Sequence, residues 1–135
     1  MTVPATPDEI AQSLLLKANS DWSVAQLCFQ NQAFDHACFH AQQAAEKYLK
    51  AYLALHKGEW QHTHSMKLLV EDCCSIDPAF STIESTAEGL TPYAVVTRYD
   101  IYFWPTAMEA EQAIEAAYVV RQFVIERLPA TLYPS

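Results

Sequence analysis

The chain has 135 residues, of which 51% are hydrophobic, 18% are charged and only two are glycine. This length and apolar content suffice for one globular domain with a substantial core, and they exclude a disordered tail. Sixteen Asp and Glu against eight Lys and Arg give a formal charge of −8. That charge excludes a protein that binds nucleic acid or acidic lipid over its whole surface, because long-range repulsion opposes a polyanion, but it is compatible with a local basic site.

The four cysteines indicate a reducing compartment. None lies in a Cys-x-x-Cys pair, and the adjacent Cys73 and Cys74 have poor geometry for a disulfide. No charged segment followed by an apolar stretch marks the N-terminus, and the longest mostly apolar uncharged stretch, around 92–97, is far shorter than the ~20 residues of a membrane helix. We expect a soluble, cytoplasmic protein with no membrane partner.

The composition predicts an all-α protein, since two glycines are too few for the tight hairpins and bulges of a sheet. The first helix is expected over about 7–30. Thr6 and Glu9 form a capping box around Pro7, and apolar residues then recur at steps of four and three through the segment.

A second long helix is expected after a short turn at Asn31-Gln32. An alanine-rich apolar stripe runs from Phe34 to Leu55, and Gly58, which follows two basic residues, suits a left-handed helix cap. Two long helices joined by so short a turn must pack antiparallel. Because alanine permits close approach, the second helix is expected to be the central one.

Two shorter helices are predicted next. One covers about 65–75. The other begins at the cap pair Asp77-Pro78 and runs to about Glu88, where Gly89 stops it.

Residues 91–106 have no clean period and hold five of the chain's 16 aromatic residues. Beyond them, Thr106 and Glu109 form a second capping box that opens the last helix, which Pro129 is expected to stop. No repeat, linker or low-complexity run divides the sequence. Residues 1–135 are therefore expected to form a single helical domain.

Positive charge and histidine are concentrated in one part of the chain. Residues 36–67 contain all five histidines and four lysines against two glutamates, a local sum of +2, so that the remaining residues sum to −10. Acidic and basic residues are thus segregated along the sequence. This distribution disfavours the wrapping of a long nucleic acid, leaves room for one phosphate-sized site on the second helix, and would let the acidic remainder meet a basic partner.

Within the second helix, polar residues form a stripe of their own, offset by about 100° from the apolar stripe. A line of donors could hold a phosphate or an acidic partner, and the alternative is the solvated flank of an amphipathic helix. The stripe consists of His36, His40, Gln43, Lys47, Lys50 and Lys57.

The sequence contains no recognised pattern for a metal site or for a catalytic nucleophile. His36 and His40 are four residues apart on a helix, and His62 and His64 could add ligands, but no carboxylate or cysteine completes a recognised spacing. The chain has no Gly-x-Ser-x-Gly, and its two glycines are isolated, which argues against phosphate-cradling loops and dinucleotide sites. No metal and no cofactor are expected.

Arg98 lies in the aromatic segment, with Tyr99 and Asp100 directly after it. Arginine beside exposed aromatic residues suits stacking on a base and pairing with a phosphate. The same composition suits a homodimer interface or a cap over the core.

Three short motifs follow one another along the chain. They are CFHAQQAAEK with LKA in the second helix, THS with LL at the start of the third, and TRYD in the aromatic segment. Together they resemble the HEPN domain family over about residues 8–126. The string HAQQAAEKYLKA is the specific part of the resemblance.

The resemblance implies an all-α, up-and-down antiparallel bundle of four to five helices that forms a homodimer and is associated with a small nucleotidyltransferase partner. Many members resemble toxins of toxin–antitoxin pairs that cut RNA without metal. In those, four to six residues separate an Arg from a following His, and the dimer axis brings two such pairs into one cleft. There the His transfers protons and the Arg stabilises charge on the phosphate.

This sequence departs from the nuclease pattern. Counting from Arg98, the His should stand at position 103, 104 or 105, but Phe103, Trp104 and Pro105 stand there, and the last histidine of the chain is His64. Arg98 can therefore be carried over as a phosphate or nucleotide contact, whereas the catalytic His cannot.

We therefore expect a binding and complex-forming subunit, not an enzyme, that contacts nucleotide or RNA phosphate. The alternative is a metal-independent endoribonuclease toxin with a non-standard site around Arg98. His40 and His64 match recurrent histidines of the family and could flank the same groove, or serve as neutral structural imidazoles. No catalytic residue is assigned. The candidate ligand-binding residues are Arg98, Lys47, Lys50, His64, His40, Gln43, Tyr99 and Asp100.

Overall fold

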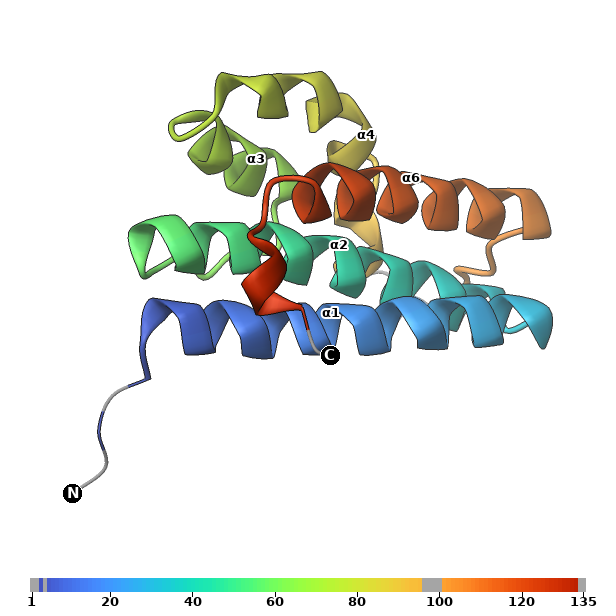
Figure 1. Cartoon of the computed structure of the whole chain (residues 1–135). Helices are drawn as coiled ribbons and strands as arrows, with labels where there is room; N and C mark the ends of the chain where they lie inside the picture. The colour runs from blue at the N-terminus through green and yellow to red at the C-terminus, as the bar shows by residue number, and fades with distance from the viewer. Residues whose placement is uncertain (1–2, 4, 96–100, 134–135) are drawn as a thin grey trace.

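The computed structural model describes residues 3, 5–95 and 101–133. Within these ranges the regular structure is five α-helices and three short 3-10 helices, with no strand, which confirms the all-α bundle. Figure 1 shows the three long helices α1, α2 and α6 running alongside one another, with α3 over α2 and with α4 packed against α3 and α6.

Helix α1 (Pro7–Gln30) begins at the predicted capping box. The Thr6 hydroxyl accepts a hydrogen bond from the backbone N–H of Glu9 at 3.1 Å, and the Glu9 carboxylate accepts one from the backbone N–H of Thr6 at 3.2 Å. The chain then reverses through a short turn in which Gln32 is left-handed, with φ 61°. The predicted antiparallel pair of α1 and α2 is confirmed (Figure 1).

Helix α2 (Phe34–Lys57) is the central element, as its alanine content predicts. Thirteen of its 24 residues are buried, against four of 24 in α1. It ends at Gly58, which adopts φ 73° and donates its N–H to the carbonyl of Ala54 at 3.0 Å. This is the left-handed cap expected from the sequence.

The segment after α3 (Met66–Cys74) is a 3-10 helix, η1 (Pro78–Ile83), followed by a five-residue helix, α4 (Glu84–Glu88). The predicted helical segment from the Asp77-Pro78 cap to Glu88 is confirmed, but its first six residues form a 3-10 helix and only the last five an α-helix. Phe80 and Ile83 are both buried, and their spacing of three matches the 3.0 residues per turn of a 3-10 helix, so the core selects the tighter winding.

A second 3-10 helix, η2 (Thr91–Ala94), precedes α6 (Ala107–Ile125), and a third, η3 (Ala130–Leu132), follows it. The capping box of Thr106 and Glu109 is confirmed, with both hydrogen bonds at 3.1 Å. The predicted end at Pro129 was wrong, because α6 stops at Ile125.

The early end of α6 has a local cause. Arg127 and Leu128 donate their backbone N–H groups to carbonyls three residues back, at 2.9 and 3.2 Å, which tightens the last turn and ends the α-helical pattern. The Tyr133 hydroxyl also donates to the carbonyl of Ile125, so the C-terminal segment occupies one of the carbonyls at the helix end.

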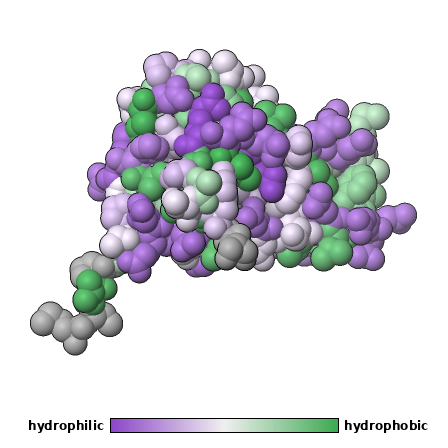
Figure 2. Space-filling model, viewed as in Figure 1, coloured by the Kyte–Doolittle hydropathy of each residue, from purple (hydrophilic) through white to green (hydrophobic). Residues whose placement is uncertain are grey.

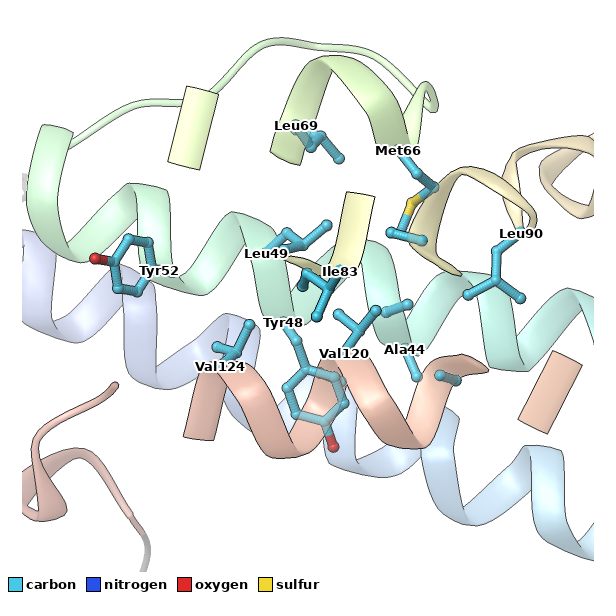
Figure 3. Close-up of a cluster of buried hydrophobic side chains, with 14 of the residues drawn as sticks. Ala44, Tyr48, Leu49, Tyr52, Met66, Leu69, Ile83, Leu90, Val120 and Val124 are labelled. Atoms are coloured by element: carbon cyan, nitrogen blue, oxygen red, sulfur yellow. The ribbon is translucent and has the colours of Figure 1, made fainter. Parts of the chain in front are cut away.

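The core has two layers, and α2 contributes to both of them (Figure 3). On one side Tyr48 packs with Val120 of α6, and on the other Leu49 points toward Leu69 of α3 and Ile83 of η1. The polar edge of α2 lies between these two buried faces. None of the helices in the described ranges has the length and apolar character needed to cross a membrane.

Candidate functional site

The polar stripe of α2 faces outward, and two carboxylates organise it. His40, Gln43, Lys47 and Lys50 are each partly exposed, whereas Glu46 within the same helix is only 3% exposed. The second carboxylate, Asp21, comes from α1. The stripe therefore has one acidic partner within α2 and one from the neighbouring helix.

Asp21 joins two of the candidate residues. Nδ1 of His40 donates to Asp21 Oδ1 at 2.9 Å, and the Lys47 ammonium donates to Asp21 Oδ2. The side chains of His40 and Lys47 are each 26% exposed, and that of Asp21 is 14% exposed. His40 and Lys47 are seven residues apart, two turns of helix, which places them on one face.

Glu46 joins two further candidate residues, Lys50 and His64. Nδ1 of His64, in the loop before α3, donates to Glu46 Oε1 at 2.9 Å, and the Lys50 ammonium donates to Oε2 at 3.0 Å. Gln42, fully buried, donates its amide N–H to Oε1 at 3.0 Å and accepts from Gln43 at 2.8 Å. All five residues therefore form one hydrogen-bonded network.

The network keeps the buried carboxylate ionised. Burial alone would raise the pKa of Glu46, but hydrogen bonds from His64, Gln42 and Lys50, together with the charge of Lys50, outweigh burial and hold the pKa below its ordinary value. A buried anion with three donors is a fixed point around which the exposed His64 and the partly exposed Lys50 are oriented.

The candidate residues thus form two groups. His40 and Lys47 meet at Asp21, while Lys50, His64 and Gln43 are connected through Glu46 and Gln42. Lys57, the last member of the stripe, pairs with Asp72 of α3 at 3.0 Å.

The segregation of acid from base along the sequence is not preserved in space. Acids from α1 and α3 lie against the basic stripe and offset its charge. A lysine ammonium has three N–H donors, however, and each of these pairs uses one of them. Lys47 and Lys50 therefore retain donors for a ligand.

Sequence reasoning missed the two carboxylates. The spacing of Glu46 and Lys50, four residues apart with the acid first, is a signal for an ion pair on a helix. No sequence signal places Asp21 or His64, because their contacts depend on how α1 and the loop before α3 pack against α2.

Arg98, Tyr99 and Asp100 lie outside the described residues. The segments on either side of them carry an exposed apolar set, which we call the aromatic patch: Val95, Ile101, Tyr102, Trp104 and Met108, with exposed fractions from 51% to 85%. Phe103 instead packs against Tyr93, with ring centroids 5.8 Å apart. Figure 2 shows hydrophobic residues interrupting the hydrophilic surface, some of them at the end of the bundle where α6 begins.

Other parts of the described structure suit an anion less well. A hollow of about 380 Å³ at the end of α2 contains Lys57 but also Glu59 and Asp72, so its formal charge is negative. In the described ranges no three His, Cys, Asp or Glu side chains come together as a metal site would require.

The cysteine thiols are also poor nucleophiles. All four cysteines are free, and Cys38 and Cys73 are fully buried. Burial, with lesser contributions from Glu109 and Asp35, raises the pKa of Cys38 to about 12, so its thiolate is scarce at neutral pH.

Comparison with known proteins decides the family. The family model for the HEPN domain matches residues 11–128, nearly the whole chain. The chain belongs to the HEPN family. The match confirms the resemblance that the HAQQAAEKYLKA string suggested.

Solved structures agree with this assignment. The crystal structure of TT1696 from Thermus thermophilus superposes with a TM-score of 0.78 and 30% identity, covering 87% of this chain and 98% of TT1696. The archaeal HEPN homologue ST0689 has a TM-score of 0.69 and 24% identity, covering 87% of this chain and 96% of ST0689, and so supports the fold. A search of curated proteins gives no match.

Proposed function

We propose that this HEPN protein is a binding and complex-forming subunit that contacts nucleotide or RNA phosphate along the polar stripe of α2, forms a homodimer, and associates with a small nucleotidyltransferase of a toxin–antitoxin type of system. The observation that carries the proposal is the partly exposed line of donors on α2, held in place by two carboxylates.

The geometry of the stripe suits a phosphate. Lys47 and Lys50 are three residues apart and therefore neighbours on the helix surface, and each keeps N–H donors that its carboxylate does not use. Charge-assisted hydrogen bonds of this kind are about twice as strong as neutral ones. Because Asp21 and Glu46 offset part of the positive charge, we expect weak binding of one phosphate group and no tight binding of a long polyanion.

The sequence favours binding over catalysis. Positions 103 to 105 hold Phe, Trp and Pro where the nuclease pattern requires a His. The aromatic patch favours complex formation, since exposed Trp, Tyr and Met are enriched at protein interfaces.

The binding site can be tested by titrating the ¹⁵N-labelled protein with AMP and following backbone amide shifts. We expect shifts concentrated on α2 between His40 and Lys50 and at His64. Replacing Lys47→Gln should weaken binding several-fold, because a charge-assisted contact is lost. Lys17→Gln, which removes an exposed lysine of α1, is the matched control and should leave the affinity unchanged. Shifts confined to other surfaces would refute the stripe as the site.

The partner can be tested by co-expressing the chain with a small nucleotidyltransferase encoded beside it. We expect the two proteins to co-purify through size-exclusion chromatography. If the gene next to this one encodes no such enzyme, or if the two proteins separate, this part of the proposal is wrong.

A further inference from the structure

His64 has one ring nitrogen engaged by the protein and the other side of the ring open to solvent. Its Nδ1 lies 2.9 Å from Glu46 Oε1, and its side chain is 61% exposed while that of Glu46 is 5% exposed. Since an ionised carboxylate only accepts hydrogen bonds, Nδ1 carries a proton, and in the neutral ring Nε2 has a free lone pair. This tautomer is fixed before any ligand arrives.

The contact between Nδ1 and Glu46 does not involve Nε2. Glu46 accepts hydrogen bonds from Gln42 and Lys50 as well as from His64, and Nδ1 carries a proton both in this neutral tautomer and in the imidazolium. The ring can therefore gain a proton at Nε2 without losing the Nδ1 contact. Protonation converts Nε2 from an acceptor into a charged donor.

Two lysines are connected to His64: Lys50 shares Glu46 with it, and Lys67 follows it by three residues in the chain. Glu46 and Lys50 of α2 pair with each other, and the next cation along the chain, Lys67 in the first turn of α3, is exposed and makes no ion pair with a described residue. Thr91 of η2 accepts from the N–H of Met66 at 3.1 Å, and the Ser65 hydroxyl accepts from the N–H of Leu68 at 3.3 Å. Two of the first three N–H groups of α3 are therefore used inside the protein.

Building on the phosphate-binding function proposed above, we propose that the Glu46–His64 pair is a site for a phosphate monoester, in which His64 binds the ligand as an imidazolium, so that binding takes up one proton. The proton comes from solvent and attaches to Nε2, and Nε2–H then donates to a non-bridging phosphate oxygen. Protonated His64 and Lys67 together carry two positive charges, which matches the nearly doubly negative monoester better than a singly charged phosphodiester.

Proton uptake is measurable by isothermal titration calorimetry. AMP is titrated at pH 7.5 in two buffers of different ionisation enthalpy, and the difference in apparent enthalpy gives the number of protons bound. We expect uptake of a substantial fraction of one proton with AMP and with inorganic phosphate, and none with adenosine, which lacks the phosphate.

Variants identify the group that is protonated. His64→Gln should abolish proton uptake and weaken AMP binding about tenfold, the effect of losing one charge-assisted hydrogen bond. His62→Gln is the matched control, since His62 is an exposed histidine of the same loop and should retain both uptake and affinity. Glu46→Gln should reduce uptake, because the imidazolium loses its anion, with circular dichroism checking that the variant is folded.

These experiments distinguish the role of His64 from phosphate binding by the stripe. Binding of AMP without proton uptake, or uptake that survives His64→Gln, would overturn the role of His64 and leave phosphate binding by the stripe in place. Failure of both AMP and inorganic phosphate to bind at millimolar concentration would overturn the proposed function itself.

Discussion

Glu46 is the residue that connects the core of this protein to its polar surface. It lies on the central helix, is 3% exposed, and accepts hydrogen bonds from Gln42, Lys50 and His64. Burying a charge is costly unless it is paired and hydrogen-bonded, and here all three donors are present. Removing the carboxylate should therefore affect both stability and the orientation of the exposed imidazole.

The stability contributed by Glu46 should depend on pH. Its pKa is held below the usual 4.5, so the carboxylate stabilises the folded state above that pH, and the contribution is lost as pH falls through the lower folded-state value. Glu46→Gln should lower the free energy of unfolding at pH 7 by about 1–3 kcal/mol, since Lys50 and His64 lose their partner but can be rehydrated.

Urea denaturation from pH 7 down to roughly pH 3.5 measures this difference, which should shrink below about pH 4.5. Glu88→Gln, which changes an exposed glutamate of α4, is the control and should cost less than about 0.5 kcal/mol. A difference between wild type and Glu46→Gln that is the same at every pH would contradict the ionised state of the buried carboxylate.

The cysteines should fall into two classes of reactivity. Cys38 and Cys73 are fully buried, and burial raises the pKa of both thiols, whereas Cys28 and Cys74 are partly exposed. With a thiol-specific reagent at pH 8, we expect only Cys28 and Cys74 to react in the folded protein, slowly but measurably. In denaturant all four cysteines should react. A double variant, Cys28→Ser with Cys74→Ser, should abolish the reaction under native conditions; four equivalent reactions in the folded wild type would show that the core opens readily.

At the scale of elements, the two glycines differ in what they do. Gly58 ends α2 with φ 73°, a conformation that other residues adopt only at a cost, while Gly89 follows α4 with a right-handed φ of −59°. The sequence suggests the same helix-stopping role for both. Only the backbone conformation separates a required glycine from a replaceable one.

This difference predicts opposite effects of one substitution. Gly58→Ala should destabilise the protein by about 1 kcal/mol although no atom lies within 4 Å of the added Cβ, because the strain is in the backbone. Gly89→Ala should be neutral or stabilising by up to about 1 kcal/mol, since its Cβ would lie at an ordinary 3.5 Å from the Thr86 carbonyl. The melting temperatures of the two variants, compared with wild type, test this difference. Equal changes in melting temperature would contradict the assigned cap geometry.

The predictions from sequence succeed where a local signal fixes an element and fail where packing does. Both capping boxes, the short turn after α1 and the Gly58 cap are set by neighbouring residues, and all were predicted correctly. The 3-10 winding of η1 and the early end of α6 depend on contacts with the core and with Tyr133, which no local pattern encodes. The same division applies to the site: the stripe on α2 was predicted, and its carboxylates Asp21 and Glu46 were not.

For the molecule as a whole, net charge alone gives an incomplete description. The sequence carries −8, and the basic window on α2 is matched by acids that the fold brings to it. The polar stripe of α2 therefore differs from the rest of the surface in how its side chains are arranged and not in its net charge. The aromatic patch is a second distinctive surface, where apolar contact and not charge would hold a partner.

The aromatic patch predicts a homodimer. Size-exclusion chromatography with light scattering should give about twice the chain mass of 15.2 kDa, and Trp104→Lys should shift the equilibrium to monomer, because Trp104 is 75% exposed and a charge there opposes apolar contact. Leu16→Lys, at a 46% exposed position of α1, is the control and should leave the mass unchanged. If Trp104→Lys remains a dimer, another surface forms the interface.

We propose above all that this HEPN protein binds phosphate and does not cleave RNA. The most direct measurement is a ³¹P NMR titration of a short 5′-phosphorylated oligoribonucleotide with the purified protein in excess chelator, because one spectrum reports both events. We expect the 5′-phosphate resonance to shift on binding and no new phosphate resonance to appear. New resonances from cleaved phosphodiesters, abolished by Arg98→Ala, would contradict the proposed binding function and establish a metal-independent ribonuclease.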